Sequence, residues 1–390
     1  MKKSIYDIFR HQNLESKPEQ EKYEYKIEKV NIILNELAEK KNRFLFYCPD
    51  VPFPVGTVKT IYDHVIILNK LGYNASVIHE VKGYRPKWLN DNQEYKKVEV
   101  TYLSKTSKNG KQSKPEINFK PTDTLIVPDG FWGVMESVVE IKTIQKVVFI
   151  MGYGGMSTAE VGLTWSHLGF NQAISVSDRL ISDYQSVFPG VKYYKATYPI
   201  NTKTFYPSLP TEKKPIIALS VRDREEAKRI INIFYSKYHF LDMFEFIVVK
   251  KKNVIDYADI LRESAVLLLS DSKSGHSQLP LEAIASNTPV IATYGRGYEH
   301  LRNHKDIIFV DSNDEFELVE ILASFCTTWL QQSPATYNTD KLILKEYSEA
   351  KVTNEVSSVY FELQENLIKK FIALKNTVKK QYENIEENGK

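Results

Sequence analysis

The chain has 390 residues, which is too long for one ordinary hydrophobic core and therefore predicts two domains. Hydrophobic residues make up 42% of the sequence and only 16 residues are glycine, a composition that excludes disordered, collagen-like and disulfide-stapled proteins. The 52 lysine and arginine residues exceed the 49 acidic residues by three, so the charge of the whole chain favours no class of partner.

The sequence contains no run of eighteen apolar residues, and its first residues lack a long apolar stretch. We therefore expect neither a signal peptide nor a membrane span. The two cysteines, Cys48 and Cys326, are far apart and match no zinc or redox spacing, which predicts reduced and buried thiols. Together these features predict a cytoplasmic protein.

Apolar residues recur at helical spacing within residues 17–41, which predicts a helical leader with one packing face. Short apolar runs then alternate with amphipathic stretches. The strands expected in this first half are 43–47, 75–79, 124–127 and 146–150, and a helix is expected at 57–71, before Gly72. Strands that alternate with helices favour a mostly parallel sheet covered by helices.

Five prolines interrupt the periodicity between residues 187 and 215, so we place an interdomain linker near the end of this stretch. Beyond it, strands are expected at 216–220, 244–249, 265–269, 290–292 and 307–310, and helices at 224–238, 254–263, 280–285 and 315–325. The residues from about 339 onward form a charged helical pattern.

The sequence therefore predicts an α/β chain with a helical leader (1–42), two Rossmann-like doubly wound domains (43–210 and 211–335) and a helical tail (336–390). We expect the tail to pack back on the first domain. Two open parallel sheets that face each other leave a cleft at the carboxyl ends of their strands, where such sheets bind ligands.

Residues 274–292 read SGHSQLPLEAIASNTPVIA, a loop, a helix start that carries a carboxylate, and a buried strand. Amide groups at a helix start favour anions, so the loop is suited to a diphosphate. The segment resembles the signature of the retaining glycosyltransferases of family 4, which have the two-domain GT-B fold. The matching positions are Gly275, Pro280, Leu281, Glu282, Ala283, Ala285, Pro289 and Val290.

This resemblance implies a retaining, metal-independent hexosyl- or pentosyltransferase that moves a sugar from a nucleoside diphosphate, with UDP favoured, to a hydroxyl group. The residues of this loop implied to bind the donor are Ser274, Gly275, His276, Ser277, Gln278 and Leu279, and the backbone amides of residues 275–279 would face its diphosphate. Glu282 would accept hydrogen bonds from the ribose, as its counterpart in the family does. The alternative for Glu282 is an ordinary surface residue after a tight turn.

Two further stretches resemble the family. The loop at 52–57 keeps Gly56 where relatives have a glycine pair near the donor phosphates, although one glycine alone also fits a simple turn. The second domain opens with Arg222, Arg224 and Lys228, where relatives place cations that stabilise the leaving diphosphate, and Arg222 is the candidate for a catalytic role. The alternative is a solvated basic helix start that pairs with neighbouring glutamates.

The sequence also departs from the family pattern. Ser274 stands where relatives have their first glutamate, and His276 and Ser277 replace an aromatic residue and a glycine. His276 either donates a hydrogen bond to the ligand or fills the loop. The histidine that relatives place after the strand at 124–127 is absent, and Asp129 is the candidate for a catalytic polar role there or, alternatively, for forming a turn. The glycine cluster at 152–155 is expected at the cleft.

Residues 82–120 contain ten basic and four acidic side chains interleaved with aromatic residues. Basic groups neutralise phosphates and aromatic rings stack on bases or sugars, so we expect this segment to bind the acceptor through Lys105, Lys108, Lys111 and Trp88. The acceptor would be polyanionic, such as hydroxymethylated phage DNA or an anionic glycopolymer. Phage DNA-glycosylating enzymes share the GT-B fold, and a phage origin would place the protein in the host cytoplasm. The alternative is a solvated, lysine-rich insertion.

Two other functions remain compatible with the fold. A catalytically inactive GT-B-like subunit would keep the scaffold and bind an acceptor or an active partner, but it has no need of a ribose-binding carboxylate such as Glu282. A nucleotide-sugar epimerase would need no large acceptor surface, so the basic aromatic segment disfavours an epimerase function.

Overall fold

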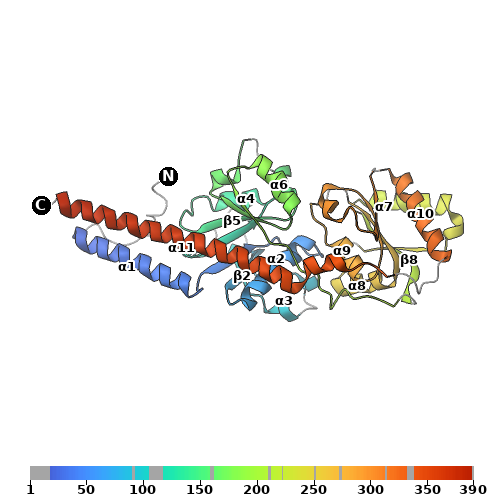
Figure 1. Cartoon of the computed structure of the whole chain (residues 1–390), viewed down its shortest axis with the longest axis horizontal. Coiled ribbons are helices and arrows are strands. Elements are labelled where there is room, and N and C mark those ends of the chain that lie inside the picture. Colours follow the sequence, from blue (N-terminus) through green and yellow to red (C-terminus); the bar gives the residue numbers. More distant parts are fainter. Residues whose placement is uncertain are drawn as a thin grey trace.

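The computed structural model describes residues 18–89, 93–104, 117–158, 162–209, 212–221, 223–249, 252–271, 275–311, 314–331 and 338–388. It contains two parallel sheets, one of seven strands and one of five, each flanked by helices (Figure 1). The expectation of an α/β chain with two doubly wound domains, a helical leader and a helical tail is therefore confirmed.

The seven-stranded sheet has the order β3-β2-β1-β4-β5-β6-β7. Its strands are β1 (Arg43–Tyr47), β2 (Asn74–Val81), β3 (Val100–Ser104), β4 (Thr124–Pro128), β5 (Gln145–Ile150), β6 (Gln172–Ser175) and β7 (Lys192–Lys195). The helices of this domain are α2 (Gly56–Lys70), α3 (Gln93–Lys97), α4 (Trp132–Ser137), α5 (Gly154–Ser157) and α6 (Asp178–Val187). Strands β4 and β5 are buried along their whole length because helices cover both faces of the sheet.

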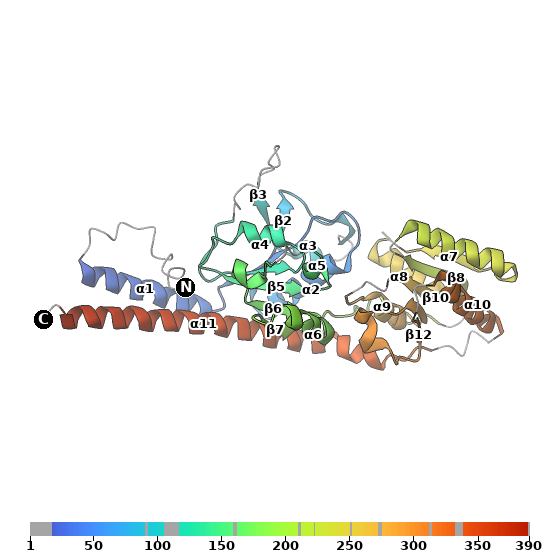
Figure 2. The same cartoon turned by 90° about the horizontal axis from the view of Figure 1, so that it is seen from above.

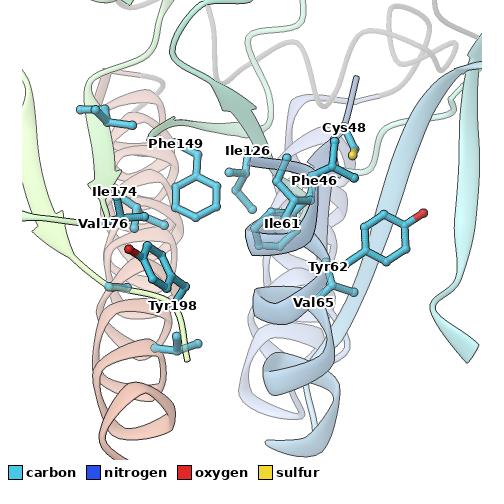
Figure 3. Close-up of a cluster of buried hydrophobic side chains, with 14 of the residues drawn as sticks. Phe46, Cys48, Ile61, Tyr62, Val65, Ile126, Phe149, Ile174, Val176 and Tyr198 are labelled. Atoms are coloured by element: carbon cyan, nitrogen blue, oxygen red, sulfur yellow. The ribbon is translucent and has the colours of Figure 1, made fainter. Parts of the chain in front are cut away.

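The core of this domain lies between α2 and the central strands, where Phe46, Ile61, Ile126 and Phe149 pack together (Figure 3). Sequence analysis missed β3, β6 and β7. Strand β7 lies at the sheet edge, and only one of its four residues is fully buried. An edge strand therefore lacks the continuous apolar run that identified the central strands.

The five-stranded sheet has the order β12-β11-β10-β8-β9. Its strands are β8 (Lys214–Val221), β9 (Glu245–Val248), β10 (Ser264–Ser270), β11 (Val290–Thr293) and β12 (Ile307–Val310). Its helices are α7 (Arg224–Lys237), α8 (Val254–Glu263), α9 (Leu279–Ala285) and α10 (Glu315–Gln331). Helices α7 and α8 start at Asp223 and Asn253, whose side chains accept hydrogen bonds from backbone N–H groups of the first turn.

Helix α11 (Glu349–Asn388) runs from the second domain along the first and then beyond it, where it lies beside α1 (Glu19–Ala38) (Figures 1 and 2). It contacts α2 and β7 on the way. The two helices share a small apolar core made of Val30, Ile33, Leu37, Leu367, Phe371, Leu374 and Val378. In the described part of the chain, no helix is both long and apolar enough to cross a membrane.

Candidate functional site

A cavity of about 1000 Å³ lies between the two domains. Its walls are the loops that follow the strands of both sheets: Asp129 comes directly after β4, Met151 after β5, Val249 after β9 and Asp271 after β10. The cleft at the carboxyl ends of both sheets is thus present. The volume is at the upper end of the range of small-molecule sites, so the cavity can enclose a ligand larger than a single sugar.

Most of the predicted site residues that the structure describes line this cavity. They are Gly56, Trp88, Asp129, Gly275, His276, Ser277, Gln278, Leu279 and Glu282. Five other predicted residues, Arg222, Ser274, Lys105, Lys108 and Lys111, lie outside the described residues.

The two remaining predicted cations, Arg224 and Lys228, are exposed on α7 and are not part of the cavity wall. The Nζ of Lys228 donates to Glu225 at 2.9 Å, which is the pairing expected of a solvated basic helix start. Sequence analysis missed Lys252 and Arg296, which do line the cavity. Lys252 lies in the loop that follows β9, and Arg296 begins a short helix after β11, so both lie beyond the carboxyl ends of strands, where a parallel sheet places ligand-binding side chains.

Asp129 is buried, at 5% exposed, and its carboxylate holds the next loop in place. One oxygen accepts hydrogen bonds from the Gly155 N–H at 2.8 Å and the Tyr184 hydroxyl at 2.7 Å, and the other accepts from the Met151 N–H at 3.3 Å. Burial raises the pKa of Asp129, and these hydrogen bonds oppose the rise. These contacts give Asp129 a positioning role in the cavity wall, and the catalytic role expected for it stays a prediction.

The glycine cluster and the signature loop touch across the cleft. A Cβ atom added to Gly275 would lie 2.4 Å from the Cα of Gly152, so the two backbones are in direct contact. Gly155, in the same cluster, has no room for a side chain either, since its Cβ would lie 2.8 Å from the Asp129 carbonyl oxygen and from the Trp165 ring. The absence of a side chain at Gly275 lets the two domains approach closely beside the cavity, and its absence at Gly155 lets that loop pack within the first domain.

A buried polar cluster joins α2 to the start of α9. The Nζ of Lys59 lies 3.2 Å from an oxygen of Asp63 and 3.5 Å from the amide oxygen of Gln278. The amide nitrogen of Gln278 donates to the Thr60 hydroxyl at 2.8 Å. Lys59 and Thr60 line the cavity and were missed from the sequence. The sequence signal that could have identified this site was a lysine, Lys59, next to Val58 on the packing face of a helix.

Glu282 is also buried, at 5% exposed, which excludes the ordinary surface role. Loss of solvation raises its pKa to about 7; the positive charge of Lys59 lowers the pKa, and the negative charge of Asp63 raises it. At neutral pH the carboxyl group is therefore divided between its ionised and neutral forms, so its ability to accept hydrogen bonds changes near pH 7.

A second contact between the domains joins α6 to the short helix at Arg296–Leu301. The Arg179 guanidinium lies 2.9 Å from Glu299, and that of Arg296 lies 3.5 Å from Asp183. These pairs are partly solvated and contribute little stability individually. The second pair places the Arg296 guanidinium beside α6 at the cavity wall.

Neither a protein-family model nor a curated protein sequence matches the chain. Solved structures do match. Sucrose-phosphate synthase from Thermosynechococcus elongatus superposes with a TM-score of 0.58 at 12% identity, over 83% of this chain and 99% of that chain. Anabaena HepE in complex with UDP and glucose gives 0.58 at 12% identity, over 82% and 99%. The pneumococcal O-GlcNAc transferase GtfA in complex with UDP and GlcNAc gives 0.54 at 12%, over 84% and 99%. At this identity the likeness establishes the fold, which is GT-B.

Proposed function

We propose that the chain is a glycosyltransferase that transfers a sugar from a nucleoside-diphosphate sugar to a hydroxyl group in the interdomain cavity. The observation that carries this proposal is that the signature loop at 275–279 and the buried Glu282 face the first domain across one ligand-sized space. The similar structures of HepE and GtfA contain UDP together with a sugar, which supports a donor of this class, and we take UDP-sugars as the donor.

In this proposal the second domain holds the nucleotide. The amides of residues 275–279 and the cations Lys252 and Arg296 stabilise the diphosphate as it leaves, so the reaction needs no metal ion. Glu282 accepts hydrogen bonds from the ribose hydroxyls. The first domain holds the acceptor, and most of the rate comes from positioning both reactants. Following the resembled family, transfer retains the anomeric configuration, and a phosphate oxygen of the leaving group takes the acceptor proton.

We expect UDP-glucose to bind about tenfold more tightly at pH 8 than at pH 6. Glu282 has a pKa of about 7, so it is mostly ionised at the higher pH and mostly protonated at the lower one. The ionised carboxylate accepts hydrogen bonds from two hydroxyls, whereas the neutral acid loses part of this capacity. Isothermal titration at both pH values measures the difference.

The control for this experiment is Glu282→Gln, which keeps the size of the side chain and removes its titration. We expect this variant to bind UDP-glucose about 10- to 100-fold more weakly at pH 8, because it removes a charged hydrogen-bond acceptor, and to show no pH dependence. Wild-type affinity that is the same at both pH values would remove Glu282 from the donor site.

We further propose a polyanionic acceptor, such as hydroxymethylated DNA or an anionic glycopolymer. The basic segment 82–120 meets the cavity at Trp88, whose indole N–H donates to the Val51 carbonyl at 3.0 Å and so fixes the ring in the wall. A phosphate-rich chain bound beside Trp88 would pass the cavity mouth.

Charge reversal at Lys105, Lys108 and Lys111 tests this acceptor. With hydroxymethylated duplex DNA as the probe, we expect weaker binding. The slope of log affinity against log salt concentration should also become shallower, by roughly 0.9 for each phosphate that the protein no longer neutralises. Hydrolysis of the donor without acceptor should not change. If the affinity for DNA and its salt dependence are those of the wild type, the segment only keeps the protein soluble.

A further inference from the structure

Three polar side chains in the cavity wall lack hydrogen-bond partners in the described part of the chain. The hydroxyls of Tyr198 and Tyr257 and both ring nitrogens of His276 are buried and have no hydrogen-bond partner among the residues that the structure describes. All three side chains line the cavity. Buried polar groups in proteins are almost always satisfied, so three unsatisfied ones at a single cavity point to a ligand that supplies the missing hydrogen bonds.

Tyr198 and His276 come from opposite sides of the cleft. Tyr198 follows β7 of the first domain, is 1% exposed, and packs beside Ile174 and Val176 (Figure 3). His276 belongs to the signature loop of the second domain, and the two ring centres are 5.3 Å apart. The transferred sugar passes from a donor held by the second domain to an acceptor held by the first, so it must lie where the two domains meet. Tyr198 and His276 lie at this place.

Tyr257 lies on the nucleotide side. It is 8% exposed on α8, which packs against α9, the helix that carries Glu282. Burial raises the pKa of both Tyr257 and Tyr198, and the negative charge of Glu282 adds to the rise, so the carboxylate lies within electrostatic range of both hydroxyls. A tyrosine hydroxyl beside a carboxylate is suited to a pair of neighbouring hydroxyls such as those of a ribose.

Among the described residues, the subsite around Tyr198 and His276 offers no compensation for a negatively charged ligand. Burial lowers the pKa of His276 well below its ordinary value, so the imidazole is neutral, with one donor and one acceptor. The positive charge of Lys195 also lowers the pKa of His276. The Nζ of Lys195 lies 2.6 Å from Asp178, however, and Lys195 does not line the cavity. The ring centre of His300 lies 4.5 Å from that of His276. Burial lowers the pKa of His300 to about 4, so this imidazole is also neutral and offers one donor and one acceptor.

We propose that Tyr198 and His276 bind the hydroxyl groups of the transferred sugar, that Tyr257 assists Glu282 at the ribose, and that the transferred sugar is uncharged. This inference rests on the proposed function, because it assigns the two sugar rings of the donor. A uronic acid at the same place would bring its carboxylate within electrostatic range of Glu282. Lys59, the cation that acts on Glu282, already lies 3.2 Å from Asp63 and is paired with it.

The test compares the binding of UDP, UDP-glucose and UDP-glucuronate to the wild type and to Tyr198→Phe. We expect the wild type to bind UDP-glucose at least about tenfold more tightly than UDP-glucuronate. Tyr198→Phe should weaken UDP-glucose about three- to tenfold, the value of one hydrogen bond, and leave UDP unchanged. The same substitution should raise the unfolding temperature of the ligand-free protein, because it removes an unsatisfied buried hydroxyl.

Tyr257→Phe should instead weaken UDP and UDP-glucose by the same factor. Tyr193→Phe is the matched control: the Tyr193 hydroxyl donates to the Phe188 carbonyl at 3.0 Å and is remote from the cavity wall, so the variant should lose stability and keep all affinities. An unchanged ratio of UDP-glucose to UDP affinity in Tyr198→Phe would overturn the inference and leave the proposed function standing. A wild type that binds none of the three nucleotides would overturn both.

Discussion

Replacing Gly275 by alanine is expected to lower the rate of sugar transfer by about 100-fold. The new Cβ would lie 2.4 Å from the Cα of Gly152, whereas carbon atoms in contact lie about 3.5–4.0 Å apart, so the two domains must separate by roughly 1 Å. A displacement of that size between reactants costs about 100-fold in rate. Steady-state kinetics with a UDP-sugar donor measures the loss.

The control is Gly190→Ala, because a Cβ at Gly190 would meet only the Ser166 hydroxyl at an ordinary 3.8 Å. We expect this variant to have wild-type activity. Both variants should unfold at nearly the wild-type temperature, since the strain in Gly275→Ala is relieved by domain opening. A Gly275→Ala enzyme with wild-type turnover would show that the closed contact between the two glycine loops has no part in the reaction.

Replacing Asp129 by alanine is expected to lower the free energy of unfolding by about 3 kcal/mol. The substitution leaves the Tyr184 hydroxyl buried without its acceptor, and the Gly155 N–H keeps only its longer hydrogen bond, to the Tyr184 oxygen at 3.1 Å. A buried group that loses its acceptor costs roughly 1–3 kcal/mol. It also frees the loop that contacts Gly275, so the rate of transfer should fall as well. Urea unfolding followed by circular dichroism measures the stability.

Asp178→Ala provides the comparison, since Asp178 is an exposed carboxylate whose pair with Lys195 is worth at most about 1 kcal/mol. If Asp129→Ala is as stable as Asp178→Ala, the buried carboxylate does not hold the loop. If Asp129→Ala is fully stable but inactive, the result would support the predicted catalytic role of Asp129 over a positioning role.

The sequence was most informative where burial produces a continuous apolar run. Strands β1, β4, β5 and β10 lie inside sheets covered on both faces, and each was predicted within two residues of its ends. The edge strand β7 was missed because half of its side chains face solvent. The signature loop was found because a glycine, a proline and a carboxylate occur there in a fixed local order.

The remaining site residues could not be found in this way, because their role depends on contacts between distant parts of the chain. Tyr153, in the same wall, donates to Asp183 at 2.8 Å, whereas Tyr198 and Tyr257 lack hydrogen-bond partners among the described residues. The sequence does not encode this difference locally. Lys252 and Arg296 look like any loop cation until the fold brings them to one cavity. Lys228, predicted from its position at a helix start, points to Glu225.

The central claim is that the cavity binds a nucleoside diphosphate, and thermal unfolding with UDP, GDP, ADP, CDP and dTDP tests it most directly. A ligand at about 100 times its dissociation constant adds roughly 2.7 kcal/mol to the free energy of unfolding, which is a clear rise in the unfolding temperature. We predict a selective rise with UDP in the wild type. If none of the five nucleotides stabilises the protein, the chain is a GT-B scaffold without a donor site.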